Sequence, residues 1–142
     1  TILFIIIQLQ FFTVKPNLNK LKKRETKRVF LGMGQTFVQQ QQQMEVVLDL
    51  IKQTPYEKIV VLGDFNNTAY SYIYREVKSQ GFYDAFKETG NGFGKTFNLR
   101  SFPLRIDFIL PSESMKILTF ENYYVPYSDH YPITATFDLN RP

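Results

Sequence analysis

Apolar and polar residues follow two patterns along the chain, one typical of buried strands and the other of an amphipathic helix. The stretches Ile2–Phe12 and Ile59–Leu62 are largely apolar, and both predict strands, the second of them covered on both faces. Between them, apolar residues recur at intervals of three, four and seven, which predicts a helix over Met33–Lys52. We expect Pro55 to close the helical region and Gly63 to end the second strand. The apolar stripe of the helix consists of Met33, Phe37, Met44, Val47, Leu48 and Ile51.

Polar tracts lie within and before this helix. The five glutamines of Gln39–Gln43 interrupt the stripe, and we interpret them as a polar helix face rather than a prion-like segment. The basic run Lys20–Arg28 is interpreted as a solvated loop or the start of the helix, because short charge runs usually face water. A loop is expected at Lys15–Asn19, which contains a proline.

The second half of the chain continues the alternation of helix and strand. Ser71–Gly81 predicts a short helix whose first residue is the N-cap and whose last residue stops it. A glycine-rich loop is expected over residues 91–98, followed by a strand at Leu104–Leu110 and a last strand at Ile133–Leu139. This alternation predicts an α/β layered architecture in one domain, residues 1–142.

Composition narrows the classes of protein that the chain can belong to. Apolar residues make up 44% of the 142 positions and aromatic residues 16%, enough for a sizeable core. The sequence has no cysteine, which excludes disulfides and thiolate metal sites. A net charge of +4 is only mildly favourable to a phosphate-bearing partner. The apolar run Ile2–Ile7 is too short to span a bilayer and is not a signal peptide, so localisation stays open. Because the chain starts at Thr1, we interpret it as a fragment or a processed form.

Polar clusters stand at the ends of the predicted strands. They are Asp64 with Asn66, Asp107 within an apolar strand, and Asp129 with His130, the only histidine of the sequence. Charged residues are seldom buried in strands without a partner or a function. A lone histidine is more often structural than catalytic, and an Asp-x-Asn pair after a strand is also typical of an ordinary turn.

Asp107 is the most informative of these positions. Strand alternation puts Arg105, Asp107 and Ile109 on one side, so that a carboxylate points to the sheet interior or its rim. The simpler alternative is that Asp107 pairs with Arg105 or caps a turn.

Taken together, the clusters suit the cleavage of phosphate esters by water. Carboxylate and amide oxygens hold a hard divalent cation such as Mg²⁺, which neutralises charge that develops on the phosphoryl oxygens. A carboxylate can orient or deprotonate the attacking water, and a protonated histidine can donate a hydrogen bond to the phosphate.

The strings "GDFN", "RIDFIL" and "SDHYPI" resemble the three C-terminal motifs of the endonuclease/exonuclease/phosphatase superfamily, which includes DNase I. The resemblance implies a four-layered α/β sandwich of the DNase I type, with mixed β-sheet and flanking helices. It covers the C-terminal portion of that domain, and the N-terminal part with its metal-binding glutamate is expected to be missing. For this reason we expect the chain alone to be weakly active or inactive.

The resemblance also implies a role for each clustered residue. Asp64 would orient or activate the water, and Asn66 would bind phosphate or metal beside it. Asp107 would hold His130 in its charged, correctly turned form, and His130 would stabilise the transition state. Asp129 would contribute to the Mg²⁺ (or Mn²⁺) site together with Asp64 and Asn66.

One position departs from the family pattern. Gln8 stands where relatives often carry a second phosphate-contacting histidine, and glutamine can donate a hydrogen bond but cannot carry positive charge. The expected partner is a phosphate-ester substrate, either nucleic acid or a phospholipid or small phosphodiester. Oligomeric state stays open. The alternative function is that of a non-catalytic or truncated descendant that retains a phosphate-binding surface.

Overall fold

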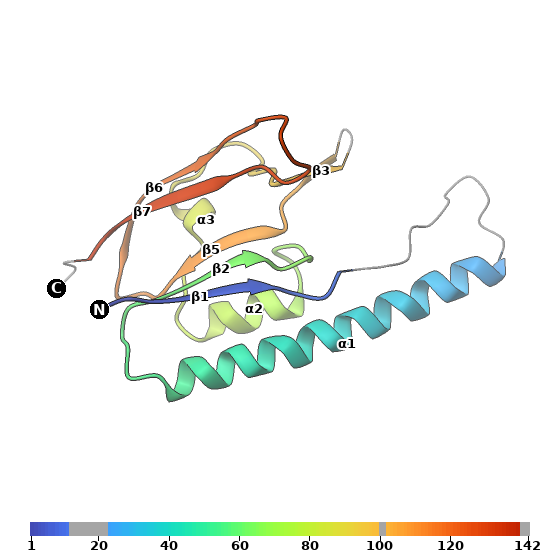
Figure 1. Ribbon diagram of the computed structural model, residues 1–142, viewed down its shortest axis with the longest axis horizontal. Helices are drawn as coiled ribbons and strands as arrows, with labels where there is room; N and C mark the ends of the chain where they lie inside the picture. The colour runs from blue at the N-terminus through green and yellow to red at the C-terminus, as the bar shows by residue number, and fades with distance from the viewer. Residues whose placement is uncertain (12–22, 100–101, 140–142) are drawn as a thin grey trace.

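A mixed β-sheet forms the centre of the molecule (Figure 1). The computed structural model describes residues 1–11, 23–99 and 102–139. The strands β1 (Leu3–Gln8), β2 (Ile59–Asp64) and β5 (Asp107–Pro111) lie in the order β1-β2-β5. β1 and β2 are parallel, whereas β2 and β5 are antiparallel, so the ends of β1 and β2 and the start of β5 meet at one edge of the sheet.

Helices cover one face of this sheet. The long helix α1 (Lys23–Gln53) and the short helix α2 (Tyr72–Ser79) lie beneath it in Figure 1. The Ser71 hydroxyl accepts a hydrogen bond from the Tyr74 amide, which confirms Ser71 as the N-cap of α2. The core on this side contains Ile5, Leu9, Met44, Leu48, Ile59, Val61, Phe65, Ile73, Tyr74, Val77, Phe82, Phe108 and Leu110.

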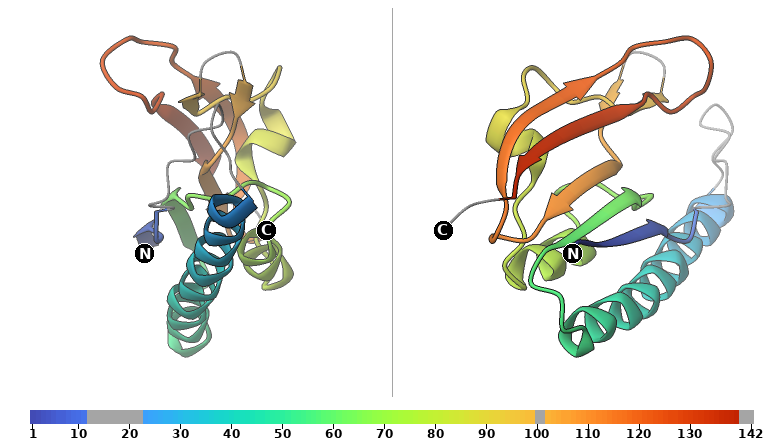
Figure 2. Two further views of the ribbon diagram at one scale, coloured as in Figure 1. Left: turned by 90° about the vertical axis from the view of Figure 1, so that its right-hand side faces the viewer. Right: turned by 60° about the vertical axis from the view of Figure 1, so that its left-hand side comes forward.

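The other face packs against a second β layer. The antiparallel strands β6 (Lys116–Asn122) and β7 (Ile133–Asp138) lie there with helix α3 (Ala85–Thr89), as two further views show (Figure 2). A small antiparallel pair, β3 (Phe97–Leu99) and β4 (Phe102–Leu104), lies at the end of the molecule where β2 finishes (Figure 1). Because Val60 belongs to the second core and its neighbours in β2 to the first, the expectation that this strand is covered on both faces is confirmed.

The predicted α/β class, with a mixed sheet and flanking helices, is confirmed, although several boundaries differ. α1 begins at Lys23, within the basic run, while the predicted loop at Lys15–Asn19 lies outside the described residues. β1 ends at Gln8, β5 begins only at Asp107, and β7 ends at Asp138. α3, β3, β4 and β6 were not predicted. Within the described residues no helix combines the length and the apolar character needed to cross a membrane.

Two expectations about the face of α1 were wrong in part. Phe37, assigned to the apolar stripe, is largely exposed, whereas Met44 and Leu48 are buried as predicted. Gln40, assigned to the polar face, is buried, and its amide makes hydrogen bonds to the chain after β2. A polar side chain is buried here because the neighbouring loop supplies its hydrogen-bond partners.

Gly63 does not end β2, contrary to the sequence interpretation. It pairs with Ile7 on one side and Phe108 on the other, and it has a φ of +132° that side chains rarely tolerate. A Cβ at this position would overlap the Ile7 carbonyl oxygen. Glycine at position 63 therefore lets β2 continue to Asp64, which lies at the edge of the sheet.

We expect Gly63→Ala to lower the free energy of unfolding by at least about 2 kcal/mol, from backbone strain and overlap with β1. Chemical denaturation measures this change. Gly34→Ala is a suitable control, because nothing lies within 4 Å of a Cβ added at this position of α1. Equal stability of Gly63→Ala and the native protein would show that β1 does not approach β2 so closely.

Candidate functional site

The candidate site is built on a row of residues across the sheet edge. Gln8 is in register with Asp64, and Asp64 is in register with Asp107. Residues in register on neighbouring strands point to the same face of the sheet, so these three polar side chains lie side by side on one face. The sequence placed these residues at the ends of apolar strands, and the sheet brings those ends together.

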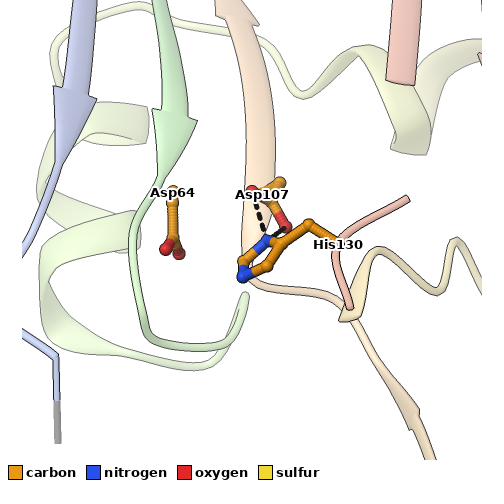
Figure 3. A group of neighbouring side chains, drawn as sticks. All are labelled: Asp64, Asp107 and His130. Carbon is orange, nitrogen blue, oxygen red and sulfur yellow. Dashed lines mark hydrogen bonds and ion pairs between the residues drawn. The ribbon is translucent and has the colours of Figure 1, made fainter. Parts of the chain in front are cut away.

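His130 completes this group from a loop far along the chain. Its Nδ1 lies 3.1 and 3.0 Å from the two carboxylate oxygens of Asp107 (Figure 3). An ionised carboxylate can only accept hydrogen bonds, so Nδ1 is the protonated nitrogen and donates to Asp107. The Phe97 ring packs edge-on to the imidazole at a centroid distance of 4.9 Å. Asp107 therefore fixes the orientation of the ring, and the second nitrogen is turned towards the side of Asp64 (Figure 3).

Asp64 is half-buried and lies opposite this pair. Burial raises the pKa of its carboxyl group above 3.8, and the nearby charge of Asp107 raises the pKa further. Two interactions oppose that rise. The backbone N–H of Asn66 donates a hydrogen bond of 2.7 Å to Oδ1 of Asp64, and His130 lies nearby. A carboxylate with a raised pKa is a better proton acceptor than an ordinary aspartate, which suits it to the activation of water.

Asn66 shapes the loop that follows Asp64. It has a φ of +46°, in the left-handed region that asparagine tolerates better than most residues. Its side-chain amide donates a hydrogen bond of 2.8 Å to the Leu9 carbonyl, while its own carbonyl accepts one of 3.2 Å from Gln40. These bonds fix the chain beside Asp64 against both β1 and α1.

The remaining predicted residues are placed differently. Gln8 is exposed at the end of β1, in the row with Asp64. Asp129 is exposed and accepts a hydrogen bond of 3.3 Å from the Ser128 hydroxyl. The group that could hold a metal among the described residues consists of Asp64, Asp107 and His130, without Asp129. The structure thus brings three predicted residues together directly, and the metal-binding role of Asp129 stays a prediction.

The donor set fits a hard divalent cation. One ligand atom from each of Asp64, Asp107 and His130 lies within 4.8 Å of the others. Both oxygens of Asp107 already accept from His130, so Asp64 is the carboxylate best placed to bind a cation. Few protein ligands suffice for Mg²⁺, which usually keeps several of its water molecules.

A buried ion pair behind the site was not predicted. Arg105 does not pair with Asp107; its Nη1 lies 3.0 and 2.9 Å from the two oxygens of Asp84. The Tyr74 hydroxyl donates a 2.6 Å hydrogen bond to the same carboxylate, and burial with this bond raises the pKa of Tyr74. Asp84 also caps α3 by accepting from the Phe86 amide. A charged residue inside the aromatic string "GFYDAF" was the available signal, but its partners lie 10 and 21 residues away.

Known proteins share the fold and the sequence pattern of this chain. Residues 8–130 match the sequence model of the Endonuclease/Exonuclease/phosphatase family. Among solved structures, the chain is similar to the endonuclease/exonuclease/phosphatase from Bacteroides vulgatus, with 28% identity and a TM-score of 0.61 over 71% of this chain and 44% of that one. No curated protein sequence matches the chain.

Two further structures have lower identity and support the fold alone. The 3'-5' exonuclease NExo from Neisseria meningitidis is 24% identical, with a TM-score of 0.59 over 78% of this chain and 55% of that one. The mannosyl-6-phosphatase from Bacteroides thetaiotaomicron is 20% identical, with a TM-score of 0.55 over 73% of this chain and 46% of that one. The chain therefore spans about half the length of the structures that it resembles.

Proposed function

Because the chain belongs to the endonuclease/exonuclease/phosphatase family, we propose that it carries the catalytic centre of a metal-dependent phosphoesterase. The observation that supports this most strongly is the Asp107–His130 ion pair beside a carboxylate of raised pKa, at one edge of the sheet. Relatives in structure include a phosphatase and an exonuclease, and phosphate esters are the chemistry common to both. We propose this activity for a protein that contains this chain within a complete family domain, hereafter the full-length protein, because the chain spans 44% of the Bacteroides vulgatus structure.

In the proposed reaction, water attacks phosphorus and the ester oxygen leaves. Asp64 orients the water and accepts its proton. The second ring nitrogen of His130 donates a hydrogen bond to a phosphoryl oxygen, and its charge balances the charge that grows there. Asp107 keeps the ring in the required tautomer and orientation.

Asp64 and Asn66 would hold Mg²⁺ or Mn²⁺, and Asp129 is a further proposed ligand. When bound, the cation supplies charge neutralisation at the phosphoryl oxygens. Gln8, in register with Asp64, can donate a hydrogen bond to the phosphate from the opposite side of the row.

Metal-dependent hydrolysis of p-nitrophenyl phosphate and bis(p-nitrophenyl) phosphate tests this proposal, on both the 142-residue chain and the full-length protein. We expect the full-length protein to release nitrophenol with Mg²⁺ or Mn²⁺ and to stop when EDTA is added. Comparing the two esters distinguishes a phosphomonoesterase from a phosphodiesterase. Failure of the full-length protein on both esters, with either ion, would instead favour a non-catalytic descendant that binds phosphate.

Thermal melts with Mg²⁺ test the metal site without any substrate. A cation that binds only the folded state stabilises it by about 2.7 kcal/mol at 100 times its Kd, so the melting temperature of the native protein should rise. Asp64→Asn should lose this rise, because the principal anionic ligand is gone. An equal rise in both proteins would place the cation elsewhere.

A further inference from the structure

Thr96 connects two parts of the site that lie far apart in sequence. It precedes β3 and is completely buried. Its hydroxyl oxygen accepts hydrogen bonds of 3.0 Å each from the backbone amides of Ile106 and Asp107. Its carbonyl accepts a 2.7 Å hydrogen bond from the amide of Tyr131, and its own amide donates to the Leu104 carbonyl at 2.9 Å.

These contacts hold both members of the Asp107–His130 pair. The Thr96 hydroxyl fixes the backbone of Asp107, and its carbonyl fixes the residue that follows His130. The next residue, Phe97, continues the connection through an isolated bridge to His130 and through its ring. The segment Thr96–Phe97 therefore joins the backbone at Asp107 to the backbone at His130. The side chains of Asp107 and His130 contact each other directly in the ion pair.

We propose that Thr96 is a positioning residue, whose hydroxyl sets the backbone of Asp107 at the distance from which its carboxylate can hold His130. The consequence for catalysis rests on the proposed function. The positioning of the Asp107–His130 ion pair does not depend on it. A hydroxyl suits this task because its oxygen has two lone pairs and can accept from two successive amides. Valine has nearly the same shape but would leave both amides without an acceptor.

The alternative is that Thr96 merely satisfies buried amides and supports stability. Ser112 provides the matched comparison, because its buried hydroxyl accepts a 3.1 Å hydrogen bond from the Ile59 amide at the opposite end of β2. Both hydroxyls make the same kind of bond, but only that of Thr96 adjoins the ion pair. Loss of stability alone therefore cannot separate the two roles, whereas a signal from His130 can.

The imidazole of His130 gives that signal, since it is the only histidine and needs no assignment among others. We would record its ¹H–¹⁵N NMR signals at one fixed pH in the native chain and in Thr96→Val, Thr96→Ser and Ser112→Ala. Asp107→Asn serves as the reference for a weakened pair. We expect Thr96→Val to shift the imidazole signals towards those of Asp107→Asn. Thr96→Ser and Ser112→Ala should retain the native signals, the latter despite a lower melting temperature.

Native imidazole signals in Thr96→Val would overturn the proposal and leave Thr96 with a structural role. Should Thr96→Val fail to fold, Thr96→Cys replaces it, because a thiol is a much weaker acceptor of similar size. A shift towards Asp107→Asn in that variant supports positioning, and unchanged signals overturn it. None of these outcomes depends on turnover, so a failure of the proposed hydrolysis is distinguishable from a failure of this inference.

Discussion

Replacing His130 with alanine should reduce phosphate-ester turnover by the full-length protein by about 10³-fold or more. The substitution removes the hydrogen-bond donor that we place at the phosphoryl oxygen, together with its charge. His130 is about one-third exposed and lies in a loop, so the fold should change little. The measurement is kcat under saturating Mg²⁺, with thermal melts to confirm that the variant is folded.

Asp107→Asn serves as the graded comparison for that experiment. Asparagine keeps the size of the side chain but offers the imidazole only one acceptor oxygen and no charge. We expect a smaller loss of turnover than in His130→Ala, with a shift in one limb of the pH profile. Native turnover in His130→Ala, in a preparation that is folded, would contradict the assigned role of the imidazole.

Asp64→Asn should raise the stability of the protein at pH 7 by an amount on the order of 1 kcal/mol, the scale of a solvent-screened charge. The raised pKa of Asp64 means that the folded state favours the protonated carboxyl. That contribution to stability is present in full below pH 3.8 and is lost as the pH rises through the raised pKa of the folded state. At pH 7 the half-buried carboxylate of Asp64 is charged, which lowers the free energy of unfolding, and asparagine carries no such charge.

The gain from Asp64→Asn should therefore shrink as the pH falls towards 3.8. Urea denaturation at several pH values measures this trend. The oxygen of asparagine can still accept from the Asn66 amide, so that the loop stays in place. Asp49→Asn, at an exposed position of α1, is the control and should show no comparable gain. A destabilised Asp64→Asn at neutral pH would mean that the charge is compensated in the native fold.

The three residues Asp64, Asp107 and His130 could be predicted because their signals are local. Asp64 and Asp107 stand beside continuous apolar runs, and His130 follows an aspartate just before the last strand. A charged residue at the end of a buried strand is conspicuous without knowledge of any partner. The alternation of helix and strand predicted the α/β class, and the resemblance to the motifs of one family added the DNase I type of sandwich.

The supporting residues could not be predicted because their partners are distant in sequence. Gln40 contacts a carbonyl 26 residues away, and Arg105 pairs with an aspartate 21 residues away. Thr96 is an ordinary residue of a glycine-rich loop until the fold brings the start of β5 against it. Only the folded backbone shows that Gln40 and Thr96 are buried and which partners these three side chains bind.

The missed strands and the misjudged glycine have their own physical causes. β6 contains a register irregularity between Ile117 and Thr119, which disrupts the alternation on which strand prediction depends. Gly63 was expected to break β2 because glycine usually interrupts a strand, yet here it permits close approach of the β1 backbone. A sequence cannot distinguish these two uses of glycine without knowing which strands are neighbours.

The most direct test of the catalytic centre compares metal-dependent ester hydrolysis by the full-length protein and its Asp64→Asn variant, purified in parallel. Without the cation the variant should be at least as stable as the native protein, and a thermal melt in the assay buffer shows that both are folded, so a difference in turnover does not come from unfolding. A contaminating phosphatase would be present in both preparations. We predict clear Mg²⁺- or Mn²⁺-dependent turnover in the native protein and a loss of about 10³-fold in the variant. Equal turnover in the two would contradict the account and move the chemistry away from Asp64.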